Sequence, residues 1–191
     1  MGNIRLDMTM SLDGFIAGPR DSKTDPMGVG GFRLFNWLDH RDEPGPHSEV
    51  YAEHVATRAF ISGRRTYELA DHWQGDHHDG VPIFILTHDV PDEPPPGTVR
   101  FVTDVRECAE LARAAAGDAD ISVHGAGAGQ SLLRAGELDE LQLHVVPVLL
   151  GTGRRLFDHL SADHVELELV RQFSTPEATH LRYRITGGTR R

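Results

Sequence analysis

Cysteine, basic residues and long apolar runs are all scarce in this sequence. Its single cysteine, Cys108, excludes an internal disulfide framework and fits a reducing compartment. Lysine and arginine number 19 against 29 aspartates and glutamates, and the resulting net charge of −10 disfavours nucleic acid and anionic membranes as partners. No apolar run approaches the roughly 18 residues that span a bilayer, and the first residues lack the layout of a signal peptide. We therefore expect a cytoplasmic protein with no membrane partner.

The length and composition predict one folded domain. A chain of 191 residues with 39% hydrophobic and 25% charged side chains can bury a sizeable core. We expect a single domain over residues 1–191, with residues 19–47 as a flap or insertion loop. This segment is rich in glycine, proline and charge, yet it contains Phe35 and Trp37. Long irregular loops are usually functional, so we expect it to cover a site or to form a subunit contact.

Alternating strand and helix patterns predict an α/β fold. The first strand, Ile4–Ser11, alternates apolar and polar residues and ends at an Asp13-Gly14 turn. Further strands are expected at 58–62, 81–86, 99–102, 120–123 and 141–148, with helices at 48–57, 66–71 and 104–116, another ending at 135, and a loop at 92–97. Two last strands, 165–170 and 181–185, should pair antiparallel around Pro176. The sequence thus predicts a mixed, mostly parallel central sheet flanked by helices.

Two segments suggest phosphate recognition. The first, residues 62–68 (SGRRTYE), joins a buried strand to a helix, and its arginines and threonine can donate hydrogen bonds to a phosphate. A surface helix start with solvated arginines is the alternative. The second, residues 124–130 (HGAGAGQ), lets the backbone approach a pyrophosphate, although tight packing of a helix on a sheet would also explain its glycines. It is not a Rossmann fingerprint, because Gln130 replaces the third glycine and no acidic residue follows at the required distance.

The order of these motifs resembles the dihydrofolate reductase superfamily. The strand followed by GRRTYE, the apolar strand ending in Leu86-Thr87-His88, and the strand followed by HGAGAGQSLL are similar to its cofactor site. The opening segment 11–18 (SLDGFIAG) resembles the branch that contains the reductase domain of riboflavin biosynthesis, as do residues 145–147 and 151–153. The resemblance implies a three-layer, dihydrofolate-reductase-like fold over nearly the whole chain.

The resemblance also implies a cofactor site. Its residues are Ala17 near the nicotinamide, Gly63, Arg64, Arg65, Thr66, Leu86, Thr87 and His88, and Gly125, Ala126, Gly127, Ala128, Gly129 and Gln130 along the pyrophosphate. Arg64 and Arg65, with His88, form a cationic cluster on an acidic chain, and the 2′-phosphate of NADPH is what distinguishes it from NADH. We therefore expect NADPH as the cofactor and hydride transfer to a small soluble substrate, heterocyclic or with a carbonyl or imine group.

Hydride transfer also requires a proton, and the sequence offers few donors beside the expected nicotinamide pocket. Asp13 is the candidate catalytic and substrate-binding residue, with a turn-forming role as its alternative. Trp37 and Val146 are candidate substrate contacts, and Trp37 could instead lie in a dimer contact. The tryptophan-containing segment that carries the carboxylate of dihydrofolate reductases is not found, and the pair Glu49 and Glu53 is typical of a solvated helix face.

Three further expectations concern other ligands and partners. The stretch 71–79 is rich in histidine and aspartate, but its crowded spacing does not match known metal motifs, so no metal site is predicted. The absent carboxylate segment keeps open a non-catalytic NADPH- or ligand-binding protein on the same fold. The resemblance implies a homodimer, for which the aromatic stretch 32–38 is a candidate contact.

Overall fold

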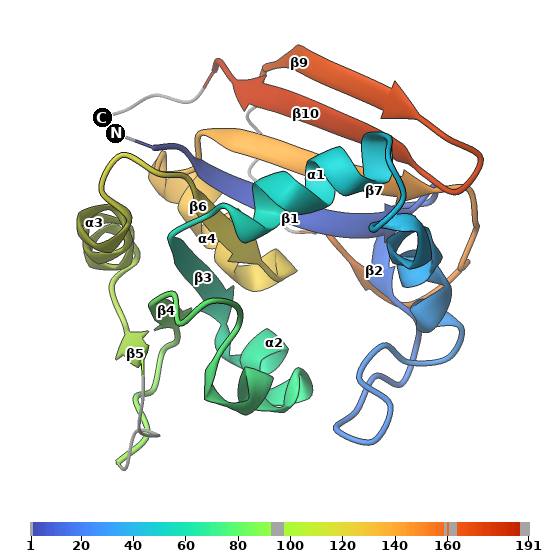
Figure 1. Cartoon of the computed structure of the whole chain (residues 1–191). Helices are drawn as coiled ribbons and strands as arrows, with labels where there is room; N and C mark the ends of the chain where they lie inside the picture. Colours follow the sequence, from blue (N-terminus) through green and yellow to red (C-terminus); the bar gives the residue numbers. More distant parts are fainter. Residues whose placement is uncertain (1, 93–97, 159, 161–163, 188–191) are drawn as a thin grey trace. The chain divides into compact units, whose positions relative to one another are not determined.

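The computed structural model describes residues 2–92, 98–158, 160 and 164–187, and they form two compact units (Figure 1). Of the described residues, 2–6 and 55–139 form unit 1, whereas 7–54 and 140–187 form unit 2. None of the described helices is long and apolar enough to cross a membrane.

The strands pair by hydrogen bonds in the order β5-β4-β3-β6-β1-β7-β10-β9, and β2 pairs with β8 separately. Their bounds are β1 Ile4–Ser11, β2 Phe15–Ala17, β3 Ala59–Gly63, β4 Ile83–Leu86, β5 Val99–Val102, β6 Ile121–His124, β7 Glu140–Val146, β8 Arg154–Arg155, β9 Leu167–Ser174 and β10 Thr179–Ile185. The helices are α1 Pro46–Val55, α2 Arg64–Leu69, α3 Val105–Ala116 and α4 Ala126–Ala135, with 3-10 helices η1 Gly31–His40 and η2 Asp71–Gly75. This mostly parallel sheet with flanking helices and antiparallel strands confirms the expected α/β fold.

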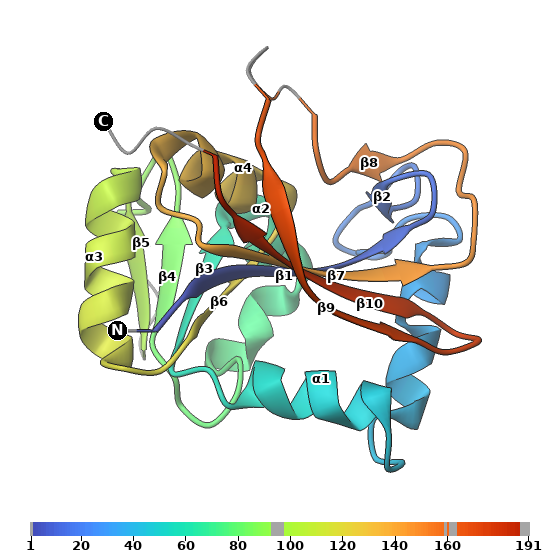
Figure 2. The same cartoon turned by 90° about the horizontal axis from the view of Figure 1, so that it is seen from above.

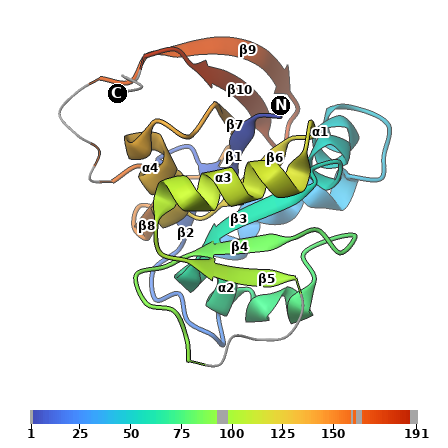
Figure 3. The ribbon, with the colours of Figure 1, turned by 90° about the vertical axis from the view of Figure 1, so that its left-hand side faces the viewer.

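Unit 1 is built on parallel strands. β3 pairs in parallel with both β4 and β6, β4 with β5, and β6 with the first residues of β1. Figure 3 shows α3 and α4 on one face of these strands and α2 on the other. Because both faces are covered, strand residues such as Phe60, Ile83 and Ile121 are fully buried, as the continuous apolar runs predict.

The two long helices of unit 1 end where the sequence predicts, and α3 also begins there, whereas α4 begins at Ala126, inside the glycine-rich turn. The side chain of Asp104 accepts hydrogen bonds from the backbone N–H groups of Arg106 and Glu107, both at 2.9 Å, and so caps α3. Gly117 and Gly136 follow α3 and α4, and Gly136 has the left-handed backbone (φ +73°) that commonly ends a helix. Cys108 is fully buried on α3, and burial raises the pKa of its thiol to about 12, so this cysteine is part of the core.

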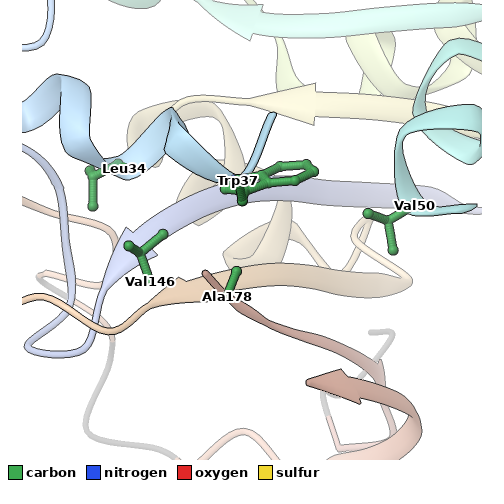
Figure 4. Packing of buried hydrophobic residues seen from close by; sticks show 5 residues of the cluster. All are labelled: Leu34, Trp37, Val50, Val146 and Ala178. Carbon is green, nitrogen blue, oxygen red and sulfur yellow. The ribbon is translucent and has the colours of Figure 1, made fainter. Parts of the chain in front are cut away.

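Unit 2 contains antiparallel strands. β10 pairs with β7 on one side and with β9 on the other, as expected for the two last strands (Figure 2). The core of the unit gathers side chains from η1, α1, β7 and the residue that precedes β10 (Figure 4). Its buried members are Leu34, Trp37, Val50, Val146 and Ala178.

The structure differs from the sequence pattern in two places, and one expected loop falls mostly outside the described residues. Residues 32–38 are not a loop, because they belong to η1, whose Leu34 and Trp37 are anchored in the core. The polar face of β1 is buried as well as the apolar face, since Asp7 and Thr9 are each only 8% exposed. Residues 93–97 of the loop expected at 92–97 lie outside the described residues.

Candidate functional site

Three of the expected cofactor motifs meet at one edge of unit 1. In the parallel register Gly63 of β3 faces Leu86 of β4, and Ser62 faces His124 of β6. Parallel strands place their carboxyl ends at the same edge, so the segments that follow these strands lie next to one another. The side chain of Ser62 donates a hydrogen bond to the carbonyl oxygen of His124 at 3.2 Å. The sheet therefore assembles the first segment, the end of β4 and the glycine-rich turn.

The first segment supplies two arginines and a hydroxyl group. Arg64 begins α2, donates from Nε to Glu68 at 2.8 Å and reaches the backbone carbonyl oxygen of Asp89 at 3.1 Å. The Glu68 carboxylate, with Asp89, raises the pKa of Arg64, so this guanidinium stays charged and is held in place. Arg65 is exposed. One held and one exposed guanidinium thus lie at this edge, where a phosphate would need cationic donors.

The three glycines of the glycine-rich turn have different surroundings, so a side chain would have a different effect at each. A side chain at Gly125, where φ is +95°, would collide with the side chain of Thr66. A Cβ at Gly129 would lie 2.8 Å from the side chain of Leu6, so this glycine serves close packing. A Cβ at Gly127 would meet no described atom within 4 Å. Packing therefore explains Gly125 and Gly129, whereas Gly127 keeps open space at the start of α4.

The start of α4 fits an anion. Gly125 precedes the helix as its N-cap residue and has no side chain with which to cap it. The first N–H groups of a ten-residue helix point out of its start and carry partial positive charge. Ala126 is half-buried, Gly127 is exposed, and Ala128 and Gln130 are buried. These residues fit a pyrophosphate group of a nucleotide, which needs N–H donors and no obstructing Cβ.

The residues after β4 continue this edge. Thr87 is buried, and its hydroxyl group donates to the carbonyl oxygen of Asp89 at 3.0 Å, which fixes the turn that Arg64 also contacts. Leu86 is half-buried and His88 is exposed. His88 is therefore an exposed residue of the turn whose Asp89 carbonyl oxygen Arg64 contacts.

Asp13 belongs to unit 2, where it holds a turn. Its Oδ1 accepts from the hydroxyl group of Ser11 at 2.6 Å and from the N–H of Leu150 at 3.1 Å, and its Oδ2 accepts from the N–H of Gly151 at 2.7 Å. The Ser11 hydrogen bond, helped by those backbone groups, lowers the pKa of this carboxyl group. A carboxylate with a lowered pKa is a poorer proton donor at neutral pH. The geometry thus favours the turn-forming role over the catalytic role expected from the sequence.

The other expected contacts in unit 2 are core residues. Trp37 is 5% exposed, its indole N–H donates to the hydroxyl oxygen of Thr9 at 3.1 Å, and Figure 4 shows it in the core among the side chains of Leu34, Val50 and Val146. Val146 is 7% exposed in the same cluster. Both side chains are thus enclosed by neighbours of unit 2, and the expectation that they contact substrate stays a prediction. Ala17, at the end of β2, is also buried.

Two polar groups differ from what the sequence suggests. Glu53 of α1 is not on a merely solvated face, since its carboxylate pairs with Arg171 and Arg182, both at 2.6 Å. In the 71–79 stretch, the ring of His77 stacks on Phe60 with centroids 3.7 Å apart, and Trp73 meets the same ring edge-on at 5.0 Å. Aromatic packing therefore accounts for part of this histidine-rich stretch.

A buried chain of histidines in unit 2 was not foreseen. His144 contacts Asp7, His180 contacts both His144 and His47, and every one of these four residues is less than 9% exposed. The available signal was the polar residues inside strongly apolar strands, Asp7 in β1 and His144 in β7. Reading them requires knowing which strands are neighbours, and sequence spacing does not provide that.

Comparisons with known proteins agree with this fold. A family model described as RibD C-terminal domain matches residues 3–181. A Shewanella sp. PV-4 structure named as a riboflavin biosynthesis protein aligns with a TM-score of 0.70 at 21% identity, covering 98% of this chain and 100% of that one. A pyrimidine reductase-like protein from Corynebacterium diphtheriae aligns with a TM-score of 0.64 at 14% identity over 98% of this chain and 93% of that one.

A third structure is longer than this chain. It is a diaminohydroxyphosphoribosylaminopyrimidine deaminase/5-amino-6-(5-phosphoribosylamino)uracil reductase from Thermotoga maritima, with a TM-score of 0.64 and 14% identity. The alignment covers 97% of this chain but 57% of that one. At these identities the structures establish a shared fold. A comparison with curated protein sequences gives no match.

Proposed function

Because the chain belongs to the RibD C-terminal domain family, whose structural neighbours support a reductase role, we propose that it is an NADPH-dependent reductase of a small soluble substrate. The substrate would be heterocyclic or would carry a carbonyl or imine group, similar in chemistry to the aminouracil named for the Thermotoga maritima protein. Bound NADPH would supply the hydride.

One observation supports the proposal: the strand ends of unit 1 bring together the segments that would bind the phosphates of NADPH. Gly127 leaves open space in the first turn of α4, and Gly63 and Leu86 are paired at the ends of β3 and β4. We assign the pyrophosphate to the backbone of residues 125–130 and to Thr66. We assign the 2′-phosphate to Arg64 and Arg65. His88, which follows β4 at the same edge, is the third cationic candidate.

The reaction also needs a proton at the atom that accumulates negative charge. Asp13 is occupied by three hydrogen bonds, so its part would be to hold the Leu150-Gly151 backbone. We therefore place no proton donor on Asp13 in this proposal.

NADPH consumption tests the proposal. Purified protein is mixed with NADPH and separately with reduced-pterin, flavin-precursor and quinone-type compounds, and the loss of nicotinamide absorbance is followed. Saturable oxidation with at least one compound is expected, and Gly127→Ala should reduce it by weakening cofactor binding. Saturable NADPH binding with no oxidation across all these compounds would favour a second candidate, a ligand-binding protein without turnover. The hydrogen bonds that hold Asp13 in its turn are the observation that favours this second candidate.

A homodimer remains a proposal that solution measurements can test. Phe32 of η1 is 59% exposed and Phe35 is 37% exposed, so the outer side of η1 offers apolar surface. Sedimentation of the wild type and of Phe32→Ser would show whether this surface joins two copies. A monomeric wild type at micromolar concentration would contradict the proposal.

A further inference from the structure

Five side chains of unit 2 form an unbroken hydrogen-bonded chain from a buried carboxylate to a half-buried one. Asp7 Oδ1 lies 2.9 Å from His144 Nε2, and His144 Nδ1 lies 2.7 Å from His180 Nδ1. His180 Nε2 then lies 2.9 Å from His47 Nδ1, and His47 Nε2 lies 3.3 Å from Glu177 Oε2. The three imidazoles come from β7, β10 and α1, so the tertiary fold creates the chain.

Both ends of the chain are ionised. Burial would raise the pKa of Asp7, but hydrogen bonds from His144 and His54 outweigh it and hold this pKa well below its ordinary value. The hydrogen bond from His47 lowers the pKa of Glu177. Ionised carboxylates only accept hydrogen bonds, so His144 Nε2 and His47 Nε2 must each carry a hydrogen.

Counting hydrogens then gives the charge of the chain. Four contacts link the five groups, and each contact needs one hydrogen on an imidazole nitrogen. Three neutral imidazoles carry only three hydrogens. Thr175 Oγ1 lies 3.1 Å from His47 Nε2, but it does not change this count. Its hydroxyl group can donate to the carbonyl oxygen of Ala178 at 3.2 Å and so can accept from His47, and an ionised Glu177 still needs a hydrogen on His47 Nε2. The fully bonded chain therefore holds one proton more than neutral histidines would.

We propose that Asp7, His144, His180, His47 and Glu177 form a proton relay that holds one excess proton and passes it between the buried and the surface end of the chain. The excess hydrogen can rest on His144 or on His47 and passes through His180 between them, and all four contacts stay satisfied in each arrangement. Moving it from His47 to His144 shifts one hydrogen across each of the two imidazole–imidazole contacts. Each N–H bond that breaks is replaced by one that forms, so neither an oxidant nor a further reactant is needed.

The surroundings suit a positive charge in this place. The Trp37 ring centroid lies 4.6 Å from that of His144, 5.0 Å from that of His180 and 5.7 Å from that of His47. An aromatic face within about 6 Å stabilises a cation. Burial lowers the pKa of His180 to about 3, so this central imidazole is neutral at rest. The positive charge then lies on His144 or His47, and His180 transfers the proton between them. The two imidazole–imidazole contacts, at 2.7 and 2.9 Å, are also too short for a zinc site. Two nitrogens bound to one zinc ion at about 2.0–2.1 Å would lie roughly 3.3 Å apart.

Other charged groups face the relay from each element packed around it. His54 of α1 lies 3.3 Å from Asp7 Oδ2, and the ring of His40 from η1 stacks on that of His47 at 5.8 Å. Arg171 of β9 acts on His180 through its charge, and it also pairs with Glu53. A protonated His40 or Arg171 would oppose the excess proton, so the two carboxylates at the ends must outweigh them.

Glu177→Gln tests the relay because it removes the need for the fourth hydrogen. The glutamine amide can donate to His47 Nε2, after which three neutral imidazoles satisfy every contact in one direction. The unfolding equilibrium constant is measured in urea between pH 6.5 and 9 for wild type, Glu177→Gln and Glu168→Gln. Glu168 is a matched control, since it pairs with Arg184 on the surface of the same unit.

We expect the unfolding constant of the wild type and of the control to rise by up to tenfold per pH unit, because the folded state holds one proton that unfolded histidines lose above about pH 6.5. Glu177→Gln should lack this one-proton dependence. Equal pH dependence in wild type and Glu177→Gln would overturn the relay. Should that variant not fold, ¹⁵N spectra of histidine in the wild type at pH 8 decide, since one imidazole with hydrogens on both nitrogens is required and only neutral imidazoles would refute it.

Discussion

At the scale of single residues, hydrogen-bond partners decide between roles that sequence alone leaves open. Asp13 follows the first strand and looks equally suited to proton transfer and to a turn. Its carboxylate accepts from Ser11, Leu150 and Gly151, which are 2 residues and 137–138 residues away along the chain. The distant pair is invisible to local spacing, and it is what makes Asp13 a structural link.

Replacing Asp13 separates these two roles. Asp13→Ala removes all three hydrogen bonds and should lower the urea midpoint of unfolding, whereas Asp13→Asn keeps an acceptor oxygen and should lower it less. NADPH affinity should stay within about twofold of wild type in both variants, a small change on the scale where tenfold is 1.4 kcal/mol. If Asp13→Asn unfolds like wild type while NADPH oxidation drops by roughly 10²-fold or more, proton transfer would be restored as its role.

Gly127, unlike Asp13, has open space where a side chain would lie. Gly127→Ala should fold at least as well as wild type, because alanine favours helix over glycine by about 0.5–1 kcal/mol and no described atom would obstruct the methyl group. NADPH should nevertheless bind more weakly, since the methyl group would stand where the pyrophosphate approaches. Thermal unfolding and cofactor titration measure the two effects, and unchanged affinity would remove the pyrophosphate from this turn.

At the scale of elements, most of the fold is predictable from local pattern. The alternation of Ile4–Ser11, the Asp104 cap and the two stop glycines define elements whose observed bounds differ by no more than a few residues. The prediction of a loop at 32–38 is wrong. This segment belongs to η1, and few of its residues are buried, so its sequence shows no clear apolar periodicity. The phosphate motifs are also predictable, since each follows a strand. The histidine relay is not, because it depends on neighbours from β1, β7, β10 and α1.

The Asp104 cap gives a direct test at this scale. Asp104→Ala leaves the backbone N–H groups of Arg106 and Glu107 without their acceptor, and should lower the free energy of unfolding by about 1 kcal/mol. Asp104→Ser keeps a capping oxygen and should recover most of that loss. Urea unfolding measures both variants, and equal stability of the alanine and serine variants would contradict the capping role.

At the scale of the whole molecule, acidity and burial set the response to pH. Burial lowers the pKa of His180 to about 3, so the folded protein keeps this imidazole neutral where an unfolded histidine, with a pKa of about 6.5, would be protonated. A depressed folded-state pKa contributes stability that is present above pH 6.5 and is lost as pH falls toward 3. His180→Asn should flatten this part of the acid unfolding curve. An unchanged curve between pH 6.5 and 4 would contradict the neutral state of His180.

Cofactor binding by this acidic molecule tests the account most directly. Wild type, Arg64→Ala, Arg65→Ala and the control Arg134→Ala, at the far end of α4, are titrated with NADPH and with NADH while nicotinamide fluorescence is followed. We predict saturable NADPH binding, and a loss of roughly 10- to 100-fold for at least one of the first two variants, from a charged hydrogen bond of about 1.5–3 kcal/mol. NADH affinity should change little, and the control should match wild type. An equal loss for both cofactors would contradict the 2′-phosphate assignment, and no saturable binding at tens of micromolar NADPH would contradict the cofactor site itself.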